Sequence, residues 1–240
     1  MTALFISDLH LSAAREDVTG AFLLFLHEVP QAGDTLYILG DLFDYWAGDD
    51  DANAPFNRRI ATALATLAAR GVGMYFMHGN RDFLAGAGFA DQARLSLLPD
   101  PYVFNLHGLP TVLLHGDTLC TDDLEYQKFR GQVRSDAWRA AFLARPLAER
   151  HAEIERLRAA SETEKAVKPA QIMDVNEDAV REVLSTTGAT RMIHGHTHRP
   201  GRHDYVMHGT PRKRWVLPAW DQHAGYLRVD PRGSELIFID

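Results

Sequence analysis

The chain lacks the features that mark three broad classes of protein. It has one cysteine among 240 residues, which excludes an intrachain disulfide and fits a reducing compartment. No apolar run approaches the roughly 20 residues of a membrane-spanning helix, and Asp8 and His10 interrupt the apolar start, so we expect no signal sequence. Excess positive charge is also missing, because the formal net charge is -7. We therefore expect a cytoplasmic protein with no nucleic-acid partner.

What the chain does have is a set of short polar blocks in a fixed order. They are 8–10 (DLH), 40–44 (GDLFD), 78–82 (HGNRD), 115–117 (HGD) and 194–198 (HGHTH). Each follows a short apolar run of the kind that forms a buried strand, so each block is expected where a strand ends and a loop begins. Ligand sites in layered α/β proteins gather at such strand ends.

The carboxylate, imidazole and amide side chains of these blocks suit a pair of metal ions. Two cations about 3.5–4 Å apart can clamp the attacking and leaving oxygens of a phosphoryl group, but they repel each other and need a shared anion. Asp41 is the candidate for that bridging carboxylate. The other ligands divide into Asp8, His10 and His198 for the first ion and Asn80, His115 and His196 for the second. Donors without thiolate favour Mn²⁺, although Fe, Co and Zn fit the same set.

Each block also has an ordinary explanation. Asp41 could cap the next element, and His115 could be a hydrogen-bonded histidine at a strand end. The joint pattern favours metals, because five blocks that each follow a strand, with glycine beside the polar residue, are hard to obtain from capping and core hydrogen bonding alone.

Block by block, the chain resembles the calcineurin-like metallophosphoesterase superfamily, with its pattern D-x-H, G-D-x-x-D, G-N-H-D, H and G-H-x-H. One departure is informative, since Arg81 replaces the histidine of the third block. That histidine protonates the leaving oxygen in much of the superfamily, whereas an arginine, with a pKa above about 12, cannot. Arg81 can still neutralise charge on a pentacovalent phosphorus. This suits a leaving group that departs as a phosphate, as in pyrophosphate cleavage.

Further motifs resemble one family, the UDP-2,3-diacylglucosamine hydrolases of lipid A biosynthesis. They are 115–123 (HGDTLCTDD), 126–127 (YQ), 172–176 (IMDVN) and 194–200 (HGHTHRP). The resemblance implies an α/β fold, a metallophosphoesterase β-sandwich flanked by helices with a helical lid insertion. It also implies hydrolysis of UDP-2,3-diacylglucosamine to UMP and 2,3-diacylglucosamine 1-phosphate (lipid X).

The expected mechanism uses a metal-bridging hydroxide that attacks the phosphorus attached to uridine. Asn80, Arg81 and His196 contact the substrate and stabilise the added negative charge. Two alternatives stay open: a phosphodiesterase or nucleotide pyrophosphatase with a soluble substrate, and a non-catalytic scaffold of the same fold. Such scaffolds typically lose metal ligands, whereas all seven are present here.

The chain divides into a core of residues 1–121 and 171–240 and a helical lid of residues 122–170. In the core we expect helices at 17–28, at 56–70 and before Gly188, antiparallel strands in 95–115 broken by Pro99, Pro101 and Pro110, and hairpin strands at the end. The run 212–214 (RKR) is expected to be a charged turn before a strand.

The lid segment differs in composition from the rest of the chain. Residues 124–168 hold ten Lys or Arg against seven acids, and Trp138 and Phe142 have helical i, i+4 spacing. The apolar residues could merely anchor two helices to the core, with the charged residues on a solvent-exposed face. A lid with both apolar and cationic side chains also suits a substrate with acyl chains and a diphosphate.

The resemblance implies that part of the substrate is bound by residues of the lid segment. Those it indicates are Asp123, Ser161, Lys165 and Lys168. It also implies peripheral contact with the cytoplasmic face of the inner membrane. Because the metal blocks lie outside the lid segment, we expect them to survive its deletion. The oligomeric state stays open.

Overall fold

The structure is a computed structural model that describes residues 1–167 and 172–239, without the side chains of residues 160–162 and 164–167. Its strands form two sheets. The six-stranded sheet has the order β11 (Gly233–Phe238), β10 (Gly225–Asp230), β1 (Ala3–Ile6), β2 (Thr35–Leu39), β3 (Gly73–Met77), β4 (Ser96–Leu98). The five-stranded sheet has the order β5 (Tyr102–Leu106), β6 (Leu109–Leu113), β7 (Arg191–His194), β9 (Thr210–Val216), β8 (Gly201–Met207).

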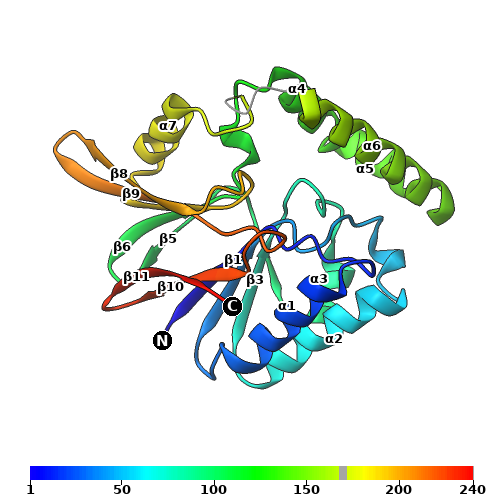
Figure 1. Cartoon of the computed structure of the whole chain (residues 1–240), viewed down its shortest axis with the longest axis horizontal. Helices are drawn as coiled ribbons and strands as arrows, with labels where there is room; N and C mark the ends of the chain where they lie inside the picture. Colours follow the sequence, from blue (N-terminus) through cyan, green and yellow to red (C-terminus); the bar gives the residue numbers. More distant parts are fainter. Residues whose placement is uncertain (168–171, 240) are drawn as a thin grey trace.

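The two sheets pack face to face, and helices cover their outer faces (Figure 1). Alternate residues of β1 point to opposite sides, so that Phe5 joins the core between the sheets while Leu4 and Ile6 join the core beneath the helices. Both faces of this strand are buried, which explains its unbroken apolar sequence. The predicted β-sandwich flanked by helices is confirmed.

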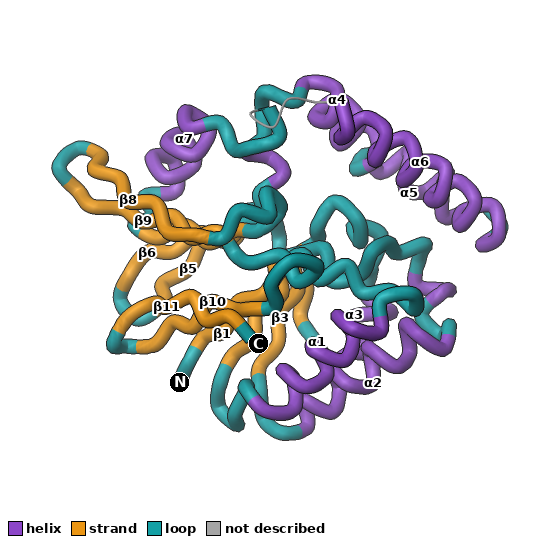
Figure 2. The backbone as a smooth tube through the Cα atoms, viewed as in Figure 1, coloured by secondary structure: helices purple, strands orange, loops and turns teal. Residues whose placement is uncertain are grey.

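Four core helices supply the outer layers. Helices α1 (Glu16–Glu28), α2 (Pro55–Ala69) and α3 (Ala87–Ala93) pack against the six-stranded sheet, and α7 (Glu177–Thr187) packs against the other (Figure 2). Helix α7 begins at the cap Asn176, whose side chain accepts from two backbone amides, and ends at Gly188 with a φ of 66°. The helices predicted at 17–28 and 56–70 agree with α1 and α2 to within one residue at each end, and the helix predicted before Gly188 is α7.

Two predictions about strands are wrong. The first strand of the region 95–115 is not antiparallel, because β4 pairs in parallel with β3, and only β5 and β6 form an antiparallel hairpin. Pro110 does not break a strand either. It lies inside β6 opposite Asn105; it has no N–H to donate, but its carbonyl oxygen still accepts from the amide of Thr190 at 2.9 Å.

The predicted charged turn at 212–214 is also wrong, because these residues lie inside β9. The hairpin turn comes earlier, at His208 and Gly209, both of which have positive φ. Arg214 is buried, since its guanidinium donates to the hydroxyl of Tyr205 at 3.0 Å and lies 3.2 Å from Nε2 of His194. Local charge pattern could not reveal these partners on distant strands.

The described part of the segment 122–170 holds the helices α4 (Leu124–Val133), α5 (Asp136–Leu143) and α6 (Leu147–Val167), which lie above the rim of the sheets (Figure 1). Trp138 and Phe142 stack with ring centroids 4.7 Å apart. Arg150 of α6 is 2% exposed and donates to the backbone oxygen of Ala47 while pairing with Asp50. Among the described residues, no helix is long and apolar enough to cross a bilayer.

Candidate metal centre

The topology brings the five polar blocks to one rim of the sandwich. Strands β1, β2 and β3 are parallel neighbours, so their carboxyl ends meet at one edge, and the blocks with Asp8, Asp41 and Asn80 follow these ends. In the second sheet β6 and β7 are also parallel, and they deliver His115 and the 194–198 block to the same rim. Segments far apart in sequence thus converge because of strand order alone.

One group of side chains gathers around His10. Its Nε2 lies 3.4 Å from Nε2 of His198 and 3.9 Å from Oδ2 of Asp41. His198 Nε2 in turn lies 3.7 Å from Oδ1 of Asp8. Asp8, His10 and His198 together form a group of donors that could hold one cation.

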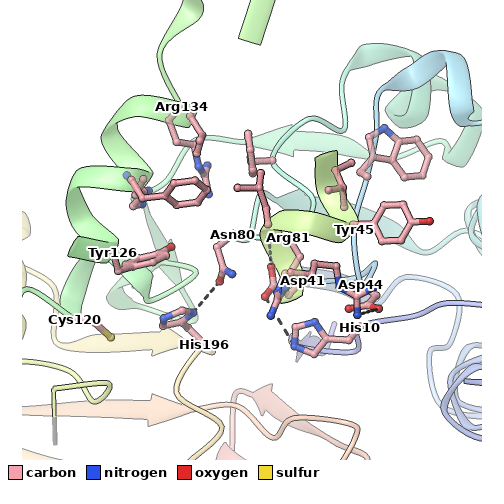
Figure 3. A pocket seen from close by; sticks show the side chains of 18 of the residues that line it. His10, Asp41, Asp44, Tyr45, Asn80, Arg81, Cys120, Tyr126, Arg134 and His196 are labelled. Carbon is pink, nitrogen blue, oxygen red and sulfur yellow. Dashed lines mark hydrogen bonds and ion pairs between the residues drawn. The ribbon is translucent and has the colours of Figure 1, made fainter. Parts of the chain in front are cut away.

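A second group gathers around Asn80. Its Oδ1 lies 3.0 Å from Nε2 of His115 and 2.9 Å from Nδ1 of His196 (Figure 3). His115 Nε2 also lies 3.8 Å from Oδ2 of Asp41, the same oxygen that faces His10. Asp41 therefore stands between the two groups, and Asp8, Asp41 and His115 also form a possible ligand set.

The structure offers independent signs that cations fit here. The Oδ1 atom of Asp8 is buried with no hydrogen-bond partner among the described residues, which is costly for a carboxylate. Donors bound at about 2.1 Å around one ion lie roughly 3 Å from each other, which matches the spacing around Asn80. Five of the seven predicted ligands also have positive φ, a strained conformation that concentrates at functional sites; they are Asp8, His10, Asp41, His196 and His198.

Two glycines allow the backbone to approach these ligands. A Cβ on Gly79 would overlap the carboxylate and amide of Asp41, and a Cβ on Gly195 would overlap Ser7 and the carboxylate of Asp8. Any side chain at either position would displace a predicted ligand.

A hydrogen bond at His115 and an ion-pair contact at His198 indicate which ring nitrogens face the site. His115 donates from Nδ1 to the backbone oxygen of Leu39 at 2.9 Å, which leaves Nε2 directed at Asn80 and Asp41. His198 has Nδ1 3.9 Å from a carboxylate oxygen of Asp221, with Nε2 on the Asp8 side. Such outer partners orient metal-binding histidines. The sequence did not single out Asp221, whose position beyond the last block carries no motif.

Burial and neighbouring charges set the protonation of these histidines. Burial, followed by the charge of His115, lowers the pKa of His196 to about 4, so its imidazole is neutral at pH 7. Burial also disfavours the charged form of His115, but Asp41, Asp117 and Asp8 outweigh it and raise its pKa to about 9. A cation that binds Nε2 of His115 must therefore displace a proton.

Asp82 holds the second and third blocks together. Its carboxylate accepts from the amides of Gly79 and Leu42, both at 2.8 Å. Burial, followed by the charge of Asp41, raises the pKa of Asp82 to about 7. The amide of Arg81 donates to Oδ1 of Asp41 at 2.8 Å, so the loop with Asn80 and Arg81 is fixed against the central carboxylate.

The rim opens into a cavity of about 530 Å³ that extends under helices α4, α5 and α6. It is lined by side chains from the rim, including Asn80, Arg81 and His196, and by aromatic and basic side chains of the helices, including Phe129, Trp138, Phe142, Arg134 and Arg158. Asp123 is buried on its wall, where it caps α4 by accepting from the amide of Tyr126 at 3.1 Å.

The other three predicted substrate contacts are less defined. The backbone of Ser161 and Lys165 lies in α6. The side chains of these two residues are outside the described part of the chain. Lys168 lies outside the described residues altogether. The structure thus brings Asn80, Arg81, Asp123 and His196 to one cavity and leaves the positions of the other three side chains open.

Sequence reasoning missed a network that joins α4 to the rim. Asp117 is buried and accepts from the hydroxyl of Tyr126 and from Nε of Arg130, both at 2.7 Å. Arg134, one turn further along α4, donates to the backbone oxygen of Gly79 at 2.7 Å. The available signal was the four-residue spacing of Tyr126, Arg130 and Arg134, which places them on one helix face.

A second link joins α6 to the GDLFD block. Arg158 pairs with Asp44 at 2.6 Å, and its guanidinium lies 5.8 Å from the ring centroid of Tyr45. The sequence indicated Asp44 only as part of a motif and Arg158 only as one of many basic residues.

Comparison with known proteins agrees with this geometry. The calcineurin-like phosphoesterase family matches residues 1–200. The UDP-2,3-diacylglucosamine hydrolase of Aromatoleum aromaticum is 52% identical, over 97% of this chain and 95% of the relative. That of Aeromonas hydrophila is 48% identical over 98% of each chain. Among solved structures, an archaeal phosphodiesterase aligns over 100% of both chains with 10% identity and a TM-score of 0.47.

Proposed function

Since this chain belongs to the calcineurin-like phosphoesterases and, within them, to the UDP-2,3-diacylglucosamine hydrolase family, we propose that it hydrolyses the pyrophosphate bond of UDP-2,3-diacylglucosamine. The products are UMP and lipid X, in lipid A biosynthesis. The observation that carries the proposal is the position of the two donor groups at the mouth of a cavity with both aromatic and cationic walls. A metal-dependent hydrolase of an acylated diphosphate needs both features.

The seven predicted ligands would hold two divalent ions, which we assign as Mn²⁺. Asp8, His10 and His198 serve one ion, Asn80, His115 and His196 serve the other, and Asp41 serves both. When bound, the ions supply a water of lowered pKa and neutralise phosphate oxygens. The neutral imidazole of His196 is suited to binding a cation, and Nε2 of His115, which faces Asn80 and Asp41, would do so on loss of its proton.

Residues of the chain stabilise the charge that develops on the phosphate. Arg81 lies on the cavity wall beside Asn80, and its guanidinium is positively charged. It neutralises negative charge without donating a proton, which is sufficient when the leaving group is the phosphate of lipid X. The amide of Asn80 and the imidazole of His196 complete the contacts with the phosphate attached to uridine.

Residues 122–170 act as a lid over a core made of residues 1–121 and 171–240. The acyl chains lie against the aromatic wall that includes Trp138 and Phe142, where their transfer from water is favourable. Asp123 accepts from a sugar hydroxyl, and Ser161, Lys165 and Lys168 provide the remaining polar contacts to the substrate.

The lid also brings the protein to its lipid substrate by peripheral contact with the cytoplasmic face of the inner membrane. Leu124 is 74% exposed, and Phe129 and Leu143 are exposed as well. Lys128, which lies on α4 with Leu124 and Phe129, carries a positive charge at the surface. Exposed apolar and basic side chains together favour binding to an anionic leaflet.

The test is an assay of the Mn²⁺-loaded protein with UDP-2,3-diacylglucosamine that resolves UMP from lipid X. UDP-N-acetylglucosamine serves as the unacylated comparison, and Asp41→Ala serves as the inactive control. We expect UMP and lipid X in equal amounts from the acylated substrate only. Equal turnover of both sugars would favour the alternative of a nucleotide pyrophosphatase with a soluble substrate. A protein that takes up no metal would favour a non-catalytic scaffold.

A further inference from the structure

A second cavity, of about 290 Å³, adjoins the rim on the side of the β8 strand. Its wall includes Thr197, Arg199, His203, Arg214 and Val216. It shares Thr197 and Arg199 with the cavity under the lid. Because Thr197 lies between the predicted ligands His196 and His198, the second cavity begins one residue away from the candidate metal centre.

The cations around this cavity already have acidic partners. Arg214 lies 3.5 Å from a carboxylate oxygen of Glu177, and Arg202 pairs with Asp204 at 2.8 Å. Arg199 pairs with Asp174. A second phosphate is therefore not the expected occupant, and the cavity suits a neutral polar group instead.

Two side chains on the wall are placed to recognise such a group. The hydroxyl oxygen of Thr197 is buried and has no hydrogen-bond partner among the described residues. His203 presents its ring from β8 and is exposed. Burial, followed by the charge of Arg214, lowers the pKa of His203, so its imidazole is neutral near pH 7 and can both donate and accept.

The proposed substrate has one part that matches this cavity. Its acyl chains need the aromatic wall under the lid, and its diphosphate must meet the ligands at the rim. The uridine half extends from the same phosphate, next to which the second cavity opens, and its base carries one N–H donor and two carbonyl acceptors. A hydroxyl and a neutral imidazole complement that set.

We propose that this second cavity is the nucleoside subsite, which takes the uracil and ribose of the substrate with Thr197 and His203 as its polar contacts. The proposal rests on the function given above, because it assumes that the phosphate attached to uridine is the one at the rim.

The experiment is calorimetric titration of UMP and, separately, of inorganic phosphate into the Mn²⁺-loaded full-length chain. Thr197→Val and His203→Ala should each weaken UMP binding about fivefold to tenfold, as expected for one lost hydrogen bond. Phosphate binding should stay unchanged, since phosphate reaches only the rim. His208→Asn, at the turn of the same hairpin, is the matched control, because His208 is exposed and Asn tolerates its positive φ.

Three results would overturn the subsite: UMP that binds wild-type protein no better than phosphate, UMP affinity unchanged in His203→Ala, or equal losses for UMP and phosphate in both variants. Failure of the proposed function is distinguishable, because it shows as absent turnover of the acylated substrate. A chain that turns over this substrate but binds UMP independently of His203 retains the function and loses the subsite.

Discussion

Arg134, the C-cap residue of α4, donates a hydrogen bond to the backbone oxygen of Gly79, one residue before the predicted ligand Asn80. Its guanidinium also lies 5.1 Å from the ring centroid of Phe83 and 3.9 Å from the carboxylate of Asp117. A helix of the lid segment thus holds the loop that carries Asn80. Because of this contact, we predict that deletion of the lid also loosens the loop of Asn80, whereas the sequence alone predicts that all the metal blocks stay intact; neither outcome is fixed by the contact itself.

The first prediction follows from this hydrogen bond. Arg134→Met removes a charged donor from the Gly79 oxygen, so Asn80 is held less firmly and the affinity for the second metal ion falls. We expect kcat/KM to drop about tenfold or more. Metal titration of the variant checks the cause. Lys128→Met, which removes an exposed charge from the same helix, should leave both quantities unchanged.

A second prediction concerns the stability of the Asp117 network. Arg130→Met leaves a buried carboxylate without its closest cation, and should lower the free energy of unfolding by about 3 kcal/mol or more. Urea denaturation measures the change. The double variant with Asp117→Asn should recover part of the loss, because the unpaired charge is then gone. No recovery would mean that Arg130 acts through packing alone.

Two glycines should respond in opposite ways to the same substitution. Gly79→Ala introduces a Cβ that overlaps Asp41, so we expect loss of metal binding and of turnover. Gly20→Ala, inside α1 where a Cβ meets nothing within 4 Å, should retain activity and gain about 0.5–1 kcal/mol of stability. Metal analysis and thermal unfolding distinguish the pair. A metal-replete, active Gly79→Ala protein would show that Asp41 is not held as described.

The phosphorus that is attacked can be identified by isotope labelling. The two phosphates of the substrate are chemically similar, so positioning decides which one meets the nucleophile. Hydrolysis in heavy-oxygen water should place the label in UMP, as determined by mass spectrometry of both products. Label in lipid X would reverse the substrate orientation and place the acyl chains on the side of His203.

The sequence predicted those parts of the site that depend on residues close to one another in the chain. Asp8, Asp41 and His115 each follow a strand within a few residues, so an apolar run and a polar block sufficed to place them at a common rim. Helices such as α7 were predicted because their caps and periodicity are local.

The remaining features depend on residues far apart in the chain. The parallel pairing of β4 with β3 and the burial of Arg214 against His194 are tertiary arrangements that override local charge and turn signals. The same holds for Arg134, whose partner Gly79 is 55 residues away. Basic residues on a helix look alike in sequence until their partners are known.

We propose that two cations, held by seven side chains around Asp41, enable hydrolysis of UDP-2,3-diacylglucosamine. The most direct test of this proposal is titration of Mn²⁺ into metal-stripped protein at a concentration well above the metal dissociation constants, with UMP release from the acylated substrate as the readout. The account predicts no release without metal and a plateau at two equivalents per chain. Full activity in the metal-stripped protein, or a plateau at one equivalent, would contradict it.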